Sequence, residues 1–350
     1  MAPRRFGSVG PTIRSVAEAA GVSVSTVSRV VREHSDVEDG TRARILRVIG
    51  ELGYRPSPIA RALVSGHSPT LGLLVSDITN PFYPQLAKTI EQAARRAGYA
   101  VVICNTDDDP LETHQYVQML TDLGVGGVIQ ASGGLDDESV IAQLGSWQRI
   151  VFANRRPAFE RCHYVVSDNE AGSVALTMHL LEQGHRSIGF IAGPEHASTA
   201  RERLSGFLKA TSAAGSQCRA IVSPGNFTIE SGHRAVREWL LHSELPTAII
   251  GVNDLVAVGA LEEIVRDGLS VPDDVAVAGF DDTEFAASEL IGLTSVRQHI
   301  DQMGREALQL LLQLVKGRRP SAPTHKILLP ELAVRRSTLH RQETASHRTL

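Results

Sequence analysis

The sequence has few cysteines, and none of them stands in a pairing pattern. Its 350 residues include only Cys104, Cys162 and Cys218, which are far apart and form no CxxC or Cys/His ligand spacing. Neither a disulfide framework nor a metal site is therefore indicated, and we expect reduced structural thiols. The N-terminus MAPRRFGSVG lacks a continuous apolar segment, and no stretch reaches the roughly 18 apolar residues of a membrane span. We expect a cytoplasmic protein with no membrane partner.

Motifs of common enzyme classes are also missing. The segment GVGGVI at 124–129 is not GxGxxG, and the chain contains no GxxxxGK[ST], GxSxG or HExxH. Four scattered histidines are better interpreted as helix-surface residues than as catalytic groups: His179, His185, His233 and His299. The sequence therefore predicts a protein that is not an enzyme and needs no cofactor.

Lysine is absent from the first 66 residues, which nevertheless carry a net charge of +4 from ten arginines and six acidic residues. The remaining 284 residues carry 25 basic and 33 acidic side chains, a net charge of −8. A basic N-terminal module on an acidic body is typical of a protein that meets nucleic-acid phosphates at one end only.

Residues 12–31, TIRSVAEAAGVSVSTVSRVV, predict two short helices around a tight turn. Apolar residues of the first helix follow i, i+3, i+4, i+7 spacing from Ile13, Gly21 permits the turn, and Ser23 can cap a helix that begins at about Val24. The second helix would bury Val27, Val30 and Val31 and leave Val24, Ser25, Ser28 and Arg29 outward. This is the pattern of a helix-turn-helix, whose second helix fits the DNA major groove.

An αα-hairpin in an ordinary helical bundle would show the same spacing, but the basic charge of this end favours DNA binding. A third helix is expected over residues 38–52, with Ile45, Val48, Ile49 and Leu52 on one face and Gly53 as its stop. The first 55 residues are thus expected to form a three-helix module. Residues 56–69 contain Pro56, Pro58, Gly66 and Pro69 and resemble a linker that is largely disordered without DNA.

From residue 70 onward, short apolar runs alternate with amphipathic helices. The expected strands are LGLLVSD, AVVICNT, GGVIQAS, RIVFANR, YVVSDN, SIGFIAG, AIVSPG, AIIGVND and VAVAGFDD. Continuous apolar strands joined by helical crossovers predict an α/β fold with parallel sheets covered on both faces. Ligands of such folds bind at the carboxyl ends of the strands.

Several motifs in order make the chain resemble the lac repressor/galactose repressor family of bacterial transcription regulators. Besides the helix-turn-helix, they are RILRVIGELGYRPSPIARALVSG, LGLLVSDITNPFYPQLAKTIEQAARRAGY, LEQGHRSIGFIAGP, RERLSGF, VNDLVAVGAL and VAVAGFDD. The resemblance covers roughly residues 12–338. It implies a body of two Rossmann-like subdomains, similar to a periplasmic sugar-binding protein, and a hinge helix at 56–69.

The resemblance also implies domain boundaries. The N-subdomain would span about 70–168 and 299–325, and the C-subdomain about 169–298 and 326–340, with a disordered tail at 341–350. The chain would cross between subdomains near Asp168, near residue 298 and near residue 325.

The residues expected to contact DNA are Thr12, Ser23, Val24, Ser25, Thr26, Ser28, Arg29, Arg32, Tyr54 and Leu63. Arg29 would read a base edge, Arg32 would contact a phosphate, and Leu63 has the position of the family's minor-groove wedge. The expected partner is a near-palindromic operator bound by a homodimer, with pairing of dimers left open.

The residues expected to line an effector site are Phe82, Tyr83, Arg155, Asp168, Ser198, Thr199, Arg201, Arg203, Phe227, Asn253 and Asp281. An Asp after a strand is often a helix cap instead, and Arg201 suits a structural ion pair as well as a ligand. Arginine donates to hydroxyl groups and aspartate accepts from them, which favours a sugar or polyol. The purine-responsive branch has Arg and Glu where this chain has Ala197 and Thr228, which disfavours a nucleobase.

A solute-binding transport protein or a small-molecule enzyme on the same body fold are the alternatives. The first would need an export signal and no DNA-binding module, and the second would turn over a substrate. We expect a repressor controlled by a small effector that closes the two subdomains.

Overall fold

The computed structural model describes residues 11–31, 36–54, 68–133, 149–157, 161–318 and 320–339. The chain divides into two compact units, residues 1–69 and residues 70–350. Most of the expected hinge segment, the tail, and the expected DNA contacts Arg32 and Leu63 lie outside the described residues.

The described part of the first unit contains three helices packed on one another: α1 (Ile13–Ala20), α2 (Val24–Val31) and α3 (Asp39–Leu52). Their shared core includes Val16 and Ala17 of α1, Val27 and Val30 of α2, and Ile45 of α3. The predicted helix-turn-helix and third helix are confirmed, because the i, i+3, i+4 pattern buries one face of each helix.

The turn between α1 and α2 follows from local chemistry. Gly21 adopts the left-handed conformation at φ 64°, and the next amide, that of Val22, donates to the carbonyl oxygen of Ala17 at 3.0 Å. The hydroxyl of Ser23 accepts from the Thr26 amide at 3.2 Å, which confirms the predicted cap of α2.

One core prediction for α3 is wrong. Leu52 was expected on the buried face, but its side chain is 39% exposed. Gly53 turns the chain in the left-handed conformation immediately after Leu52, and Tyr54 then returns to the core, its amide donating to the Ile49 carbonyl oxygen at 3.1 Å. Tyr54, and not Leu52, therefore belongs to the core of the first unit.

The second unit, the body, contains two six-stranded sheets. The N-sheet has the order β11-β5-β4-β3-β1-β2 and all its described pairings are parallel. The C-sheet has the order β12-β10-β9-β8-β6-β7, in which only β12 is antiparallel among the described pairings. The strands are β1 (Thr70–Val75), β2 (Ala100–Asn105), β3 (Val128–Gln130), β4 (Ile150–Ala153), β5 (His163–Ser167), β6 (Ser187–Ile191), β7 (Arg219–Ser223), β8 (Ala248–Gly251), β9 (Ala276–Asp281), β10 (Thr294–Arg297), β11 (His325–Leu328) and β12 (Glu331–Ala333).

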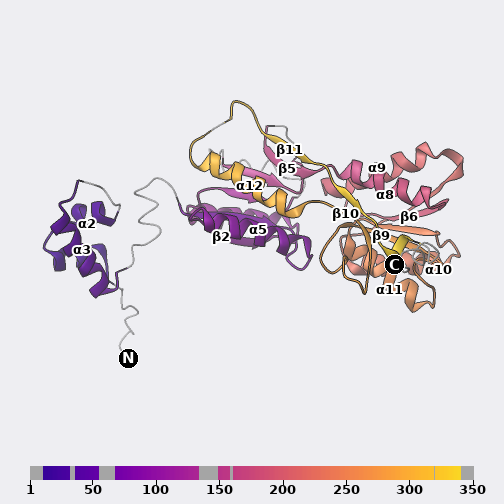
Figure 1. The fold of residues 1–350 in the computed structure, drawn as a ribbon, viewed down its shortest axis with the longest axis horizontal. Coiled ribbons are helices and arrows are strands. Elements are labelled where there is room, and N and C mark those ends of the chain that lie inside the picture. The colour runs from indigo at the N-terminus through magenta and orange to yellow at the C-terminus, as the bar shows by residue number, and fades with distance from the viewer. Residues whose placement is uncertain are drawn as a thin grey trace, which may run out of the picture. The chain divides into compact units, whose positions relative to one another are not determined.

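Helices cover both faces of the sheets, so each subdomain is a three-layer sandwich (Figure 1). Among the described residues, the helices of the N-subdomain are α5 (Phe82–Arg96), α6 (Pro110–Asp122) and α12 (Ile300–Val315), and those of the C-subdomain are α8 (Asn169–Glu182), α9 (Ser198–Ala213), α10 (Ile229–Leu241) and α11 (Asp254–Arg266). Short 3₁₀ helices occupy Gly215–Gln217 and Arg336–Thr338. The α/β architecture with parallel sheets is confirmed.

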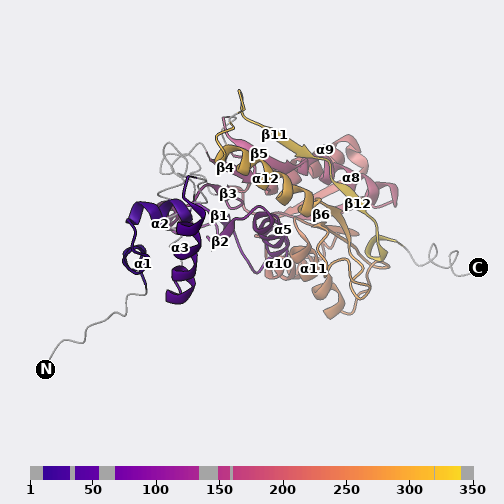
Figure 2. The ribbon, with the colours of Figure 1, turned by 60° about the vertical axis from the view of Figure 1, so that its left-hand side comes forward.

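The chain passes between the subdomains at three places. It leaves the N-sheet after β5, returns between β10 and α12, and leaves again between β11 and β12, which follow one another from one subdomain to the other in Figure 2. The third crossing was expected near residue 325 but lies at residues 329–330, because 325–328 pairs in parallel with β5 as an added strand. The pattern of apolar runs missed β10, β11 and β12, which are short and contain polar residues.

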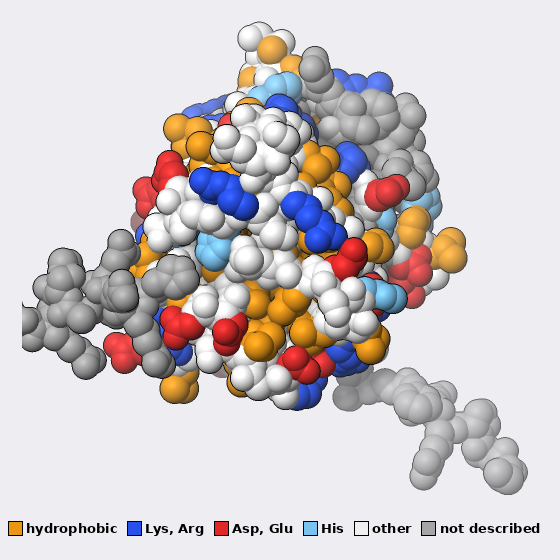
Figure 3. Space-filling model, turned by 90° about the vertical axis from the view of Figure 1, so that its right-hand side faces the viewer, with side chains coloured by type: hydrophobic (Ala, Val, Ile, Leu, Met, Phe, Trp, Pro, Cys, Tyr) orange, Lys and Arg blue, Asp and Glu red, His pale blue; other side chains and the backbone are white. Residues whose placement is uncertain are grey.

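The cysteines form no disulfide: Cys104 and Cys162 are buried and Cys218 is half-buried. Within the described residues, no helix is long and apolar enough to cross a membrane. Figure 3 shows the end of the body that carries α8, α9 and α10, where basic, acidic and hydrophobic side chains alternate in small groups. This face presents no broad basic surface of the kind that binds a nucleic-acid backbone.

Candidate functional site: a cavity between the subdomains and an exposed helix face

A cavity of about 290 Å³ lies between the two subdomains of the body. Its lining comes from the loops that follow strands β1, β2 and β4 in the N-sheet and β6, β7, β8 and β9 in the C-sheet. Because the carboxyl ends of both parallel sheets meet here, the site has the location that open α/β folds use for ligands.

Backbone strain is concentrated on this lining. Four non-glycine residues that line the cavity have positive φ: Asp107 at 50°, Asp108 at 55°, Asn154 at 68° and Asp281 at 115°. Such conformations cost free energy and are typically retained where a side chain must point in a particular direction.

The C-subdomain contributes a buried ion pair. Arg203 of α9 and Asp281 at the end of β9 lie 3.2 Å apart, and their side chains are only 4% and 5% exposed. The Arg203 guanidinium also donates to the Val252 carbonyl oxygen at 2.7 Å and stacks 3.8 Å from the centre of the Phe280 ring. Burial lowers the pKa of Arg203, but an arginine remains protonated at neutral pH.

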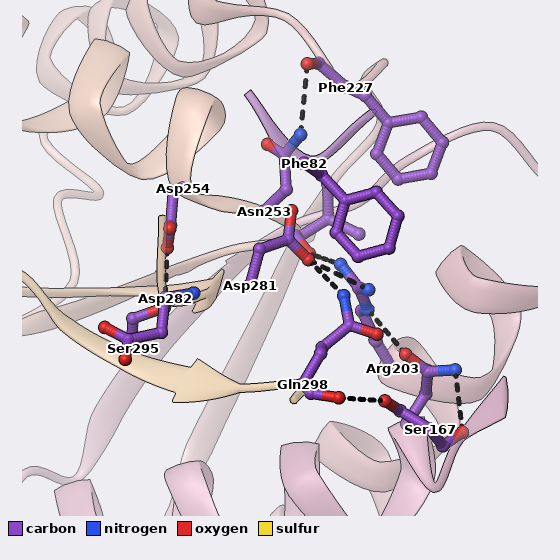
Figure 4. Close-up of polar contacts among 12 residues, drawn as sticks. Phe82, Ser167, Arg203, Phe227, Asn253, Asp254, Asp281, Asp282, Ser295 and Gln298 are labelled. Carbon is purple, nitrogen blue, oxygen red and sulfur yellow. Dashed lines mark hydrogen bonds and ion pairs between the residues drawn. The ribbon is translucent and has the colours of Figure 1, made fainter. Parts of the chain in front are cut away.

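A closed ring of contacts joins this ion pair to two of the three crossings (Figure 4). Arg203 donates to Asn169 Oδ1 at 3.0 Å, and Asn169 donates to the Ser167 carbonyl oxygen at 3.2 Å. The Ser167 hydroxyl donates to the Gln298 carbonyl oxygen at 3.1 Å, and the Gln298 amide returns to Asp281 at 2.5 Å. The ring therefore connects two lining residues, Arg203 and Asp281, to the segments where the chain crosses between the subdomains.

The N-subdomain contributes a second buried ion pair, between Arg155 and Asp108 at 2.6 Å. Asp108 also accepts from the Ser76 hydroxyl at 2.6 Å, and the Tyr83 hydroxyl donates to Ser76 at 3.0 Å. The Arg155 guanidinium lies 5.7 Å from the centre of the Phe227 ring, so the two subdomains touch across the cavity.

Some buried polar atoms of the lining have no hydrogen-bond partner among the described residues. They are Oδ1 of Asn154, Nε of Arg155 and Nε2 of His196. Buried polar groups are rarely left unpaired, and groups of this kind indicate where a ligand or water completes the hydrogen bonding.

A second acid, Asp254 at the start of α11, lies behind Asp281. It accepts from the Thr283 amide and hydroxyl, each at 2.8 Å, and from the Ser295 hydroxyl at 2.6 Å. Burial, and then the charge of Asp281, raise the pKa of Asp254 to about 7. Burial also raises the pKa of Asp281, to about 6, against the opposing effect of Arg203.

The structure brings together most of the predicted effector residues. Those that line the cavity are Phe82, Tyr83, Arg155, Thr199, Arg203, Phe227, Asn253 and Asp281. Asn253 is also a helix cap, since its Oδ1 accepts from the Val256 amide at 2.9 Å. Thr228, which argues against a purine, lines the cavity, whereas Ala197 is fully buried at the start of α9.

Three predicted effector residues do not line the cavity. Asp168 caps α8 by accepting from the Ala171 amide at 3.0 Å, and the buried Ser198 hydroxyl accepts from the Arg156 amide at 3.0 Å. Arg201 donates to the Glu195 and His196 carbonyl oxygens at 2.7 and 3.0 Å, so it braces a loop.

Sequence reasoning named Thr228 only as the position of a base-reading residue, and it missed nine other described lining residues: Ser76, Asp77, Asn80, Asp107, Asp108, Asn154, Pro194, His196 and Asn226. Most of them come directly after a strand. The rule that ligands bind at the carboxyl ends of strands, which identified the other lining residues, would therefore have identified these as well. Of the four histidines expected on helix surfaces, His179 on α8 and His233 on α10 lie on helices and are half-buried. The expectation is wrong for His185, which is buried in the loop after α8, and for the half-buried His299, which precedes α12. Each contacts a neighbouring side chain, and none of the four lines the cavity.

The second candidate site is the outer face of α2. Val24 is 41% exposed, and Ser25 and Arg29 are exposed beside it. Nη1 of Arg29 lies 3.6 Å from Oδ2 of Asp36, an exposed ion pair of little energetic value that DNA can replace. Of the other predicted contacts, Thr12 and Ser23 are exposed, Thr26 and Ser28 are half-buried, and Tyr54 is buried.

Comparisons with known proteins match both units of the chain. The family model "Bacterial regulatory proteins, lacI family" matches residues 12–57, and "Periplasmic binding protein-like domain" matches residues 177–338. The HTH-type transcriptional regulator DegA of Bacillus subtilis is 35% identical over 331 residues, which cover 93% of this chain and 98% of DegA. The chain belongs to the LacI family.

Two further matches agree with this assignment to the LacI family. The HTH-type transcriptional repressor PurR of Photobacterium profundum is 31% identical, over 93% of this chain and 98% of PurR. A crystal structure of the lac repressor dimer bound to operator and the anti-inducer ONPF is 29% identical with a TM-score of 0.84, over 95% of this chain and 100% of that one. This LacI-family chain is a DNA-binding transcription regulator with an effector-binding body, and it is not an enzyme.

Proposed function

We propose that this regulator is a repressor whose affinity for its operator is controlled by a sugar or polyol bound between the subdomains. The observation that carries the proposal is the composition of the cavity. A guanidinium, a carboxylate and an amide, those of Arg203, Asp281 and Asn253, share it with the aromatic rings of Phe82 and Phe227. Polar groups that both donate and accept, set between aromatic walls, suit a hydroxyl-rich ring.

The route from effector to DNA follows from the position of the cavity. A ligand that contacts Arg155 from one subdomain and Arg203 from the other has different contacts in open and closed arrangements, so it favours one of them. The ring of hydrogen bonds through Gln298 and Ser167 links that choice to the crossings. We infer that the changed arrangement alters how two copies of the chain present their first units to DNA in the cytoplasm.

DNA reading is assigned to α2. We infer that Val24, Ser25 and Arg29 face base edges in the major groove, with Arg29 donating to a guanine. A homodimer would place two such helices on a near-palindromic operator. Arg32 is expected to contact a phosphate, and Leu63 keeps the minor-groove role that the resemblance implies.

A purine corepressor is the second candidate, because PurR is among the relatives. Thr228 and Ala197 disfavour it, since neither supplies the charged groups that would read a base edge. The test is to identify bound genomic sites, then to titrate one of them with the purified chain in the presence of sugars, polyols or purine bases. A change in operator affinity with a sugar or polyol supports the proposal, and a change with a purine base alone refutes it.

A further inference from the structure

The cavity has an excess of negative charge. Four carboxylates line it, those of Asp77, Asp107, Asp108 and Asp281, against the two guanidiniums of Arg155 and Arg203 among the described lining residues. Arg203 keeps Asp281 ionised at neutral pH by direct pairing. The lining therefore carries two more negative than positive charges when these carboxylates are ionised.

Both guanidiniums are already committed to partners within the protein. Arg155 donates to Asp108 at 2.6 Å and to the Gly133 carbonyl oxygen at 2.8 Å. Arg203 contacts Asp281, Asn169 and the Val252 carbonyl oxygen. An anionic group that took the donors used in these contacts would displace a buried pair and leave a buried carboxylate uncompensated, which is strongly unfavourable.

Asp77 and Asp107 contact polar groups but no cation among the described residues. One carboxylate oxygen of Asp77 accepts from the Thr79 amide at 2.8 Å and from its hydroxyl at 2.6 Å. A carboxylate oxygen of Asp107 accepts from the Asn105 amide at 2.7 Å. These two acids are the source of the uncompensated charge.

Two of the lining residues, Asn154 and Arg155, also hold buried side-chain atoms without a hydrogen-bond partner among the described residues. Oδ1 of Asn154 is an acceptor and Nε of Arg155 is a donor, and the two side chains are 5% and 4% exposed as whole residues. A hydroxyl group can donate to one and accept from the other, whereas a phosphate dianion or a carboxylate only accepts. A carboxylate or phosphate group at that position would leave the acceptor of Asn154 unsatisfied, whereas a hydroxyl group there would satisfy it.

We propose that the cavity takes a monosaccharide-sized sugar or polyol that is neutral or carries an amino group, and discriminates against its phosphate ester or sugar acid through Asp77 and Asp107. The cavity volume of about 290 Å³ is at the low end for small-molecule sites, roughly 300–1,000 Å³. This inference rests on the proposed function, because it assumes that the effector binds in this cavity.

The test uses the full-length protein and matched ligand pairs. Pentoses, hexoses, hexitols and hexosamines are each measured beside the phosphate ester or acid of the same compound, by isothermal titration calorimetry. The double variant Asp77→Asn, Asp107→Asn removes two charges and keeps the oxygen acceptors, and asparagine tolerates the positive φ at residue 107. The control variant Asp122→Asn, Asp267→Asn removes two exposed charges from residues that do not line the cavity.

In the wild type and the control, we expect the phosphate ester or acid to bind at least about ten-fold more weakly than its uncharged counterpart. In the Asp77→Asn, Asp107→Asn variant, we expect the ratio of the Kd of the charged compound to that of its uncharged counterpart to fall by at least about three-fold. We also expect a hexosamine to bind this variant no more tightly than the hexose, in contrast to wild type. If the double variant kept the wild-type ratio of these Kd values, the role of Asp77 and Asp107 would be contradicted.

A sugar phosphate or acid that binds the wild type as well as or better than the matched neutral compound would overturn the inference and leave the proposed function intact. If no sugar or polyol binds, or only purines bind, the proposed function fails and the inference fails with it. These outcomes are distinguishable within one ligand panel.

Discussion

Among single residues, Asp254 is the most sensitive to pH. It is buried and its pKa is raised to about 7, whereas an aspartate in an unfolded chain titrates near 4. Between these values the folded protein holds a proton that the unfolded chain has released. The free energy of unfolding must therefore fall as pH rises through this window. Asp281, whose pKa is raised to about 6, acts in the same direction.

We predict that Asp254→Asn reduces the decrease in stability between pH 5 and pH 8, because the variant has no charge to bury. The measurement is the midpoint of thermal unfolding at several pH values, compared with wild type and with Asp267→Asn, which removes an exposed carboxylate. A wild-type slope that survives unchanged in Asp254→Asn would show that Asp254 is not the titrating group.

Arg29 gives the residue-scale prediction for DNA. Its side chain is exposed on α2, and a guanidinium paired bidentately with guanine contributes about 1–3 kcal/mol of discrimination. Arg29→Ala should therefore weaken operator binding while binding to random duplex is largely retained. Arg14→Ala, which removes an exposed charge from α1, is the matched control. Equal losses on operator and random duplex in a fluorescence anisotropy titration would exclude base reading by Arg29.

Site residues were predictable to the extent that they follow strands. The position of Asp281 after VAVAGF placed it correctly, and the same rule applied to LGLLVSD would have found Asp77. The role of each such residue was not predictable. Asp168 and Asp281 both follow strands, but Asp168 caps α8 and only Asp281 lines the cavity. Whether such a residue caps a helix or faces a ligand depends on φ and on the elements opposite, which are not local properties of the sequence.

At the scale of elements, helix α10 packs closely on α11 because glycines lie where the two backbones meet. A methyl group on Gly259 would overlap the carbonyl oxygen of Ile229, and one on Gly232 would overlap the carbonyl oxygen of Val256. No side-chain rotation can relieve a clash with backbone. The approach of these two helices therefore depends on glycine at both positions.

We predict that Gly259→Ala lowers the free energy of unfolding of the body by about 1–3 kcal/mol, the usual cost of overpacking. Gly50→Ala makes the same chemical change in α3, where nothing lies within 4 Å of the new Cβ, and it should be neutral or stabilising by up to about 1 kcal/mol. Denaturant unfolding followed by circular dichroism measures both. Equal effects of the two substitutions would contradict the packing explanation.

The helices of the first unit and the long apolar strands were predictable because their patterns are periodic and their burial is one-sided or complete. The strands β10, β11 and β12 were not, since four residues such as His325–Leu328 carry no detectable period. β11 is a strand because β5 offers an open edge, and β12 because β10 does. The burial of Tyr54 was not predictable either, because it depends on the turn at Gly53, which returns the chain to the core after the helix has ended.

At the scale of the whole molecule, the proposal of a homodimer has a direct consequence for DNA. Two identical copies related by a two-fold axis read matching half-sites, so the operator should be nearly palindromic. We predict a hydroxyl-radical footprint with two symmetric halves at saturating protein. Protection of one asymmetric half-site under the same conditions would refute dimeric operator binding.

The two-subdomain organisation follows from the number of strands, but its use as a switch follows from the contacts. The cavity is connected to the crossings by an ion pair and hydrogen bonds of Arg203, Gln298 and Ser167. No sequence pattern predicts these contacts. By linkage, an effector that changes operator affinity must have its own affinity changed by the operator to the same extent. The expected coupling is about 1–3 kcal/mol.

The central claim is that a sugar or polyol in the cavity controls DNA binding, and the most direct test is operator titration with and without the effector in wild type and in Asp281→Asn. Asparagine keeps the acceptor for Gln298 but removes the charge opposite Arg203. We predict that the effector changes the operator Kd of wild type by about 5- to 150-fold and leaves that of Asp281→Asn nearly unchanged, with both proteins folded by circular dichroism. If the operator Kd of wild type did not change with any sugar or polyol that binds the body, the account would be contradicted.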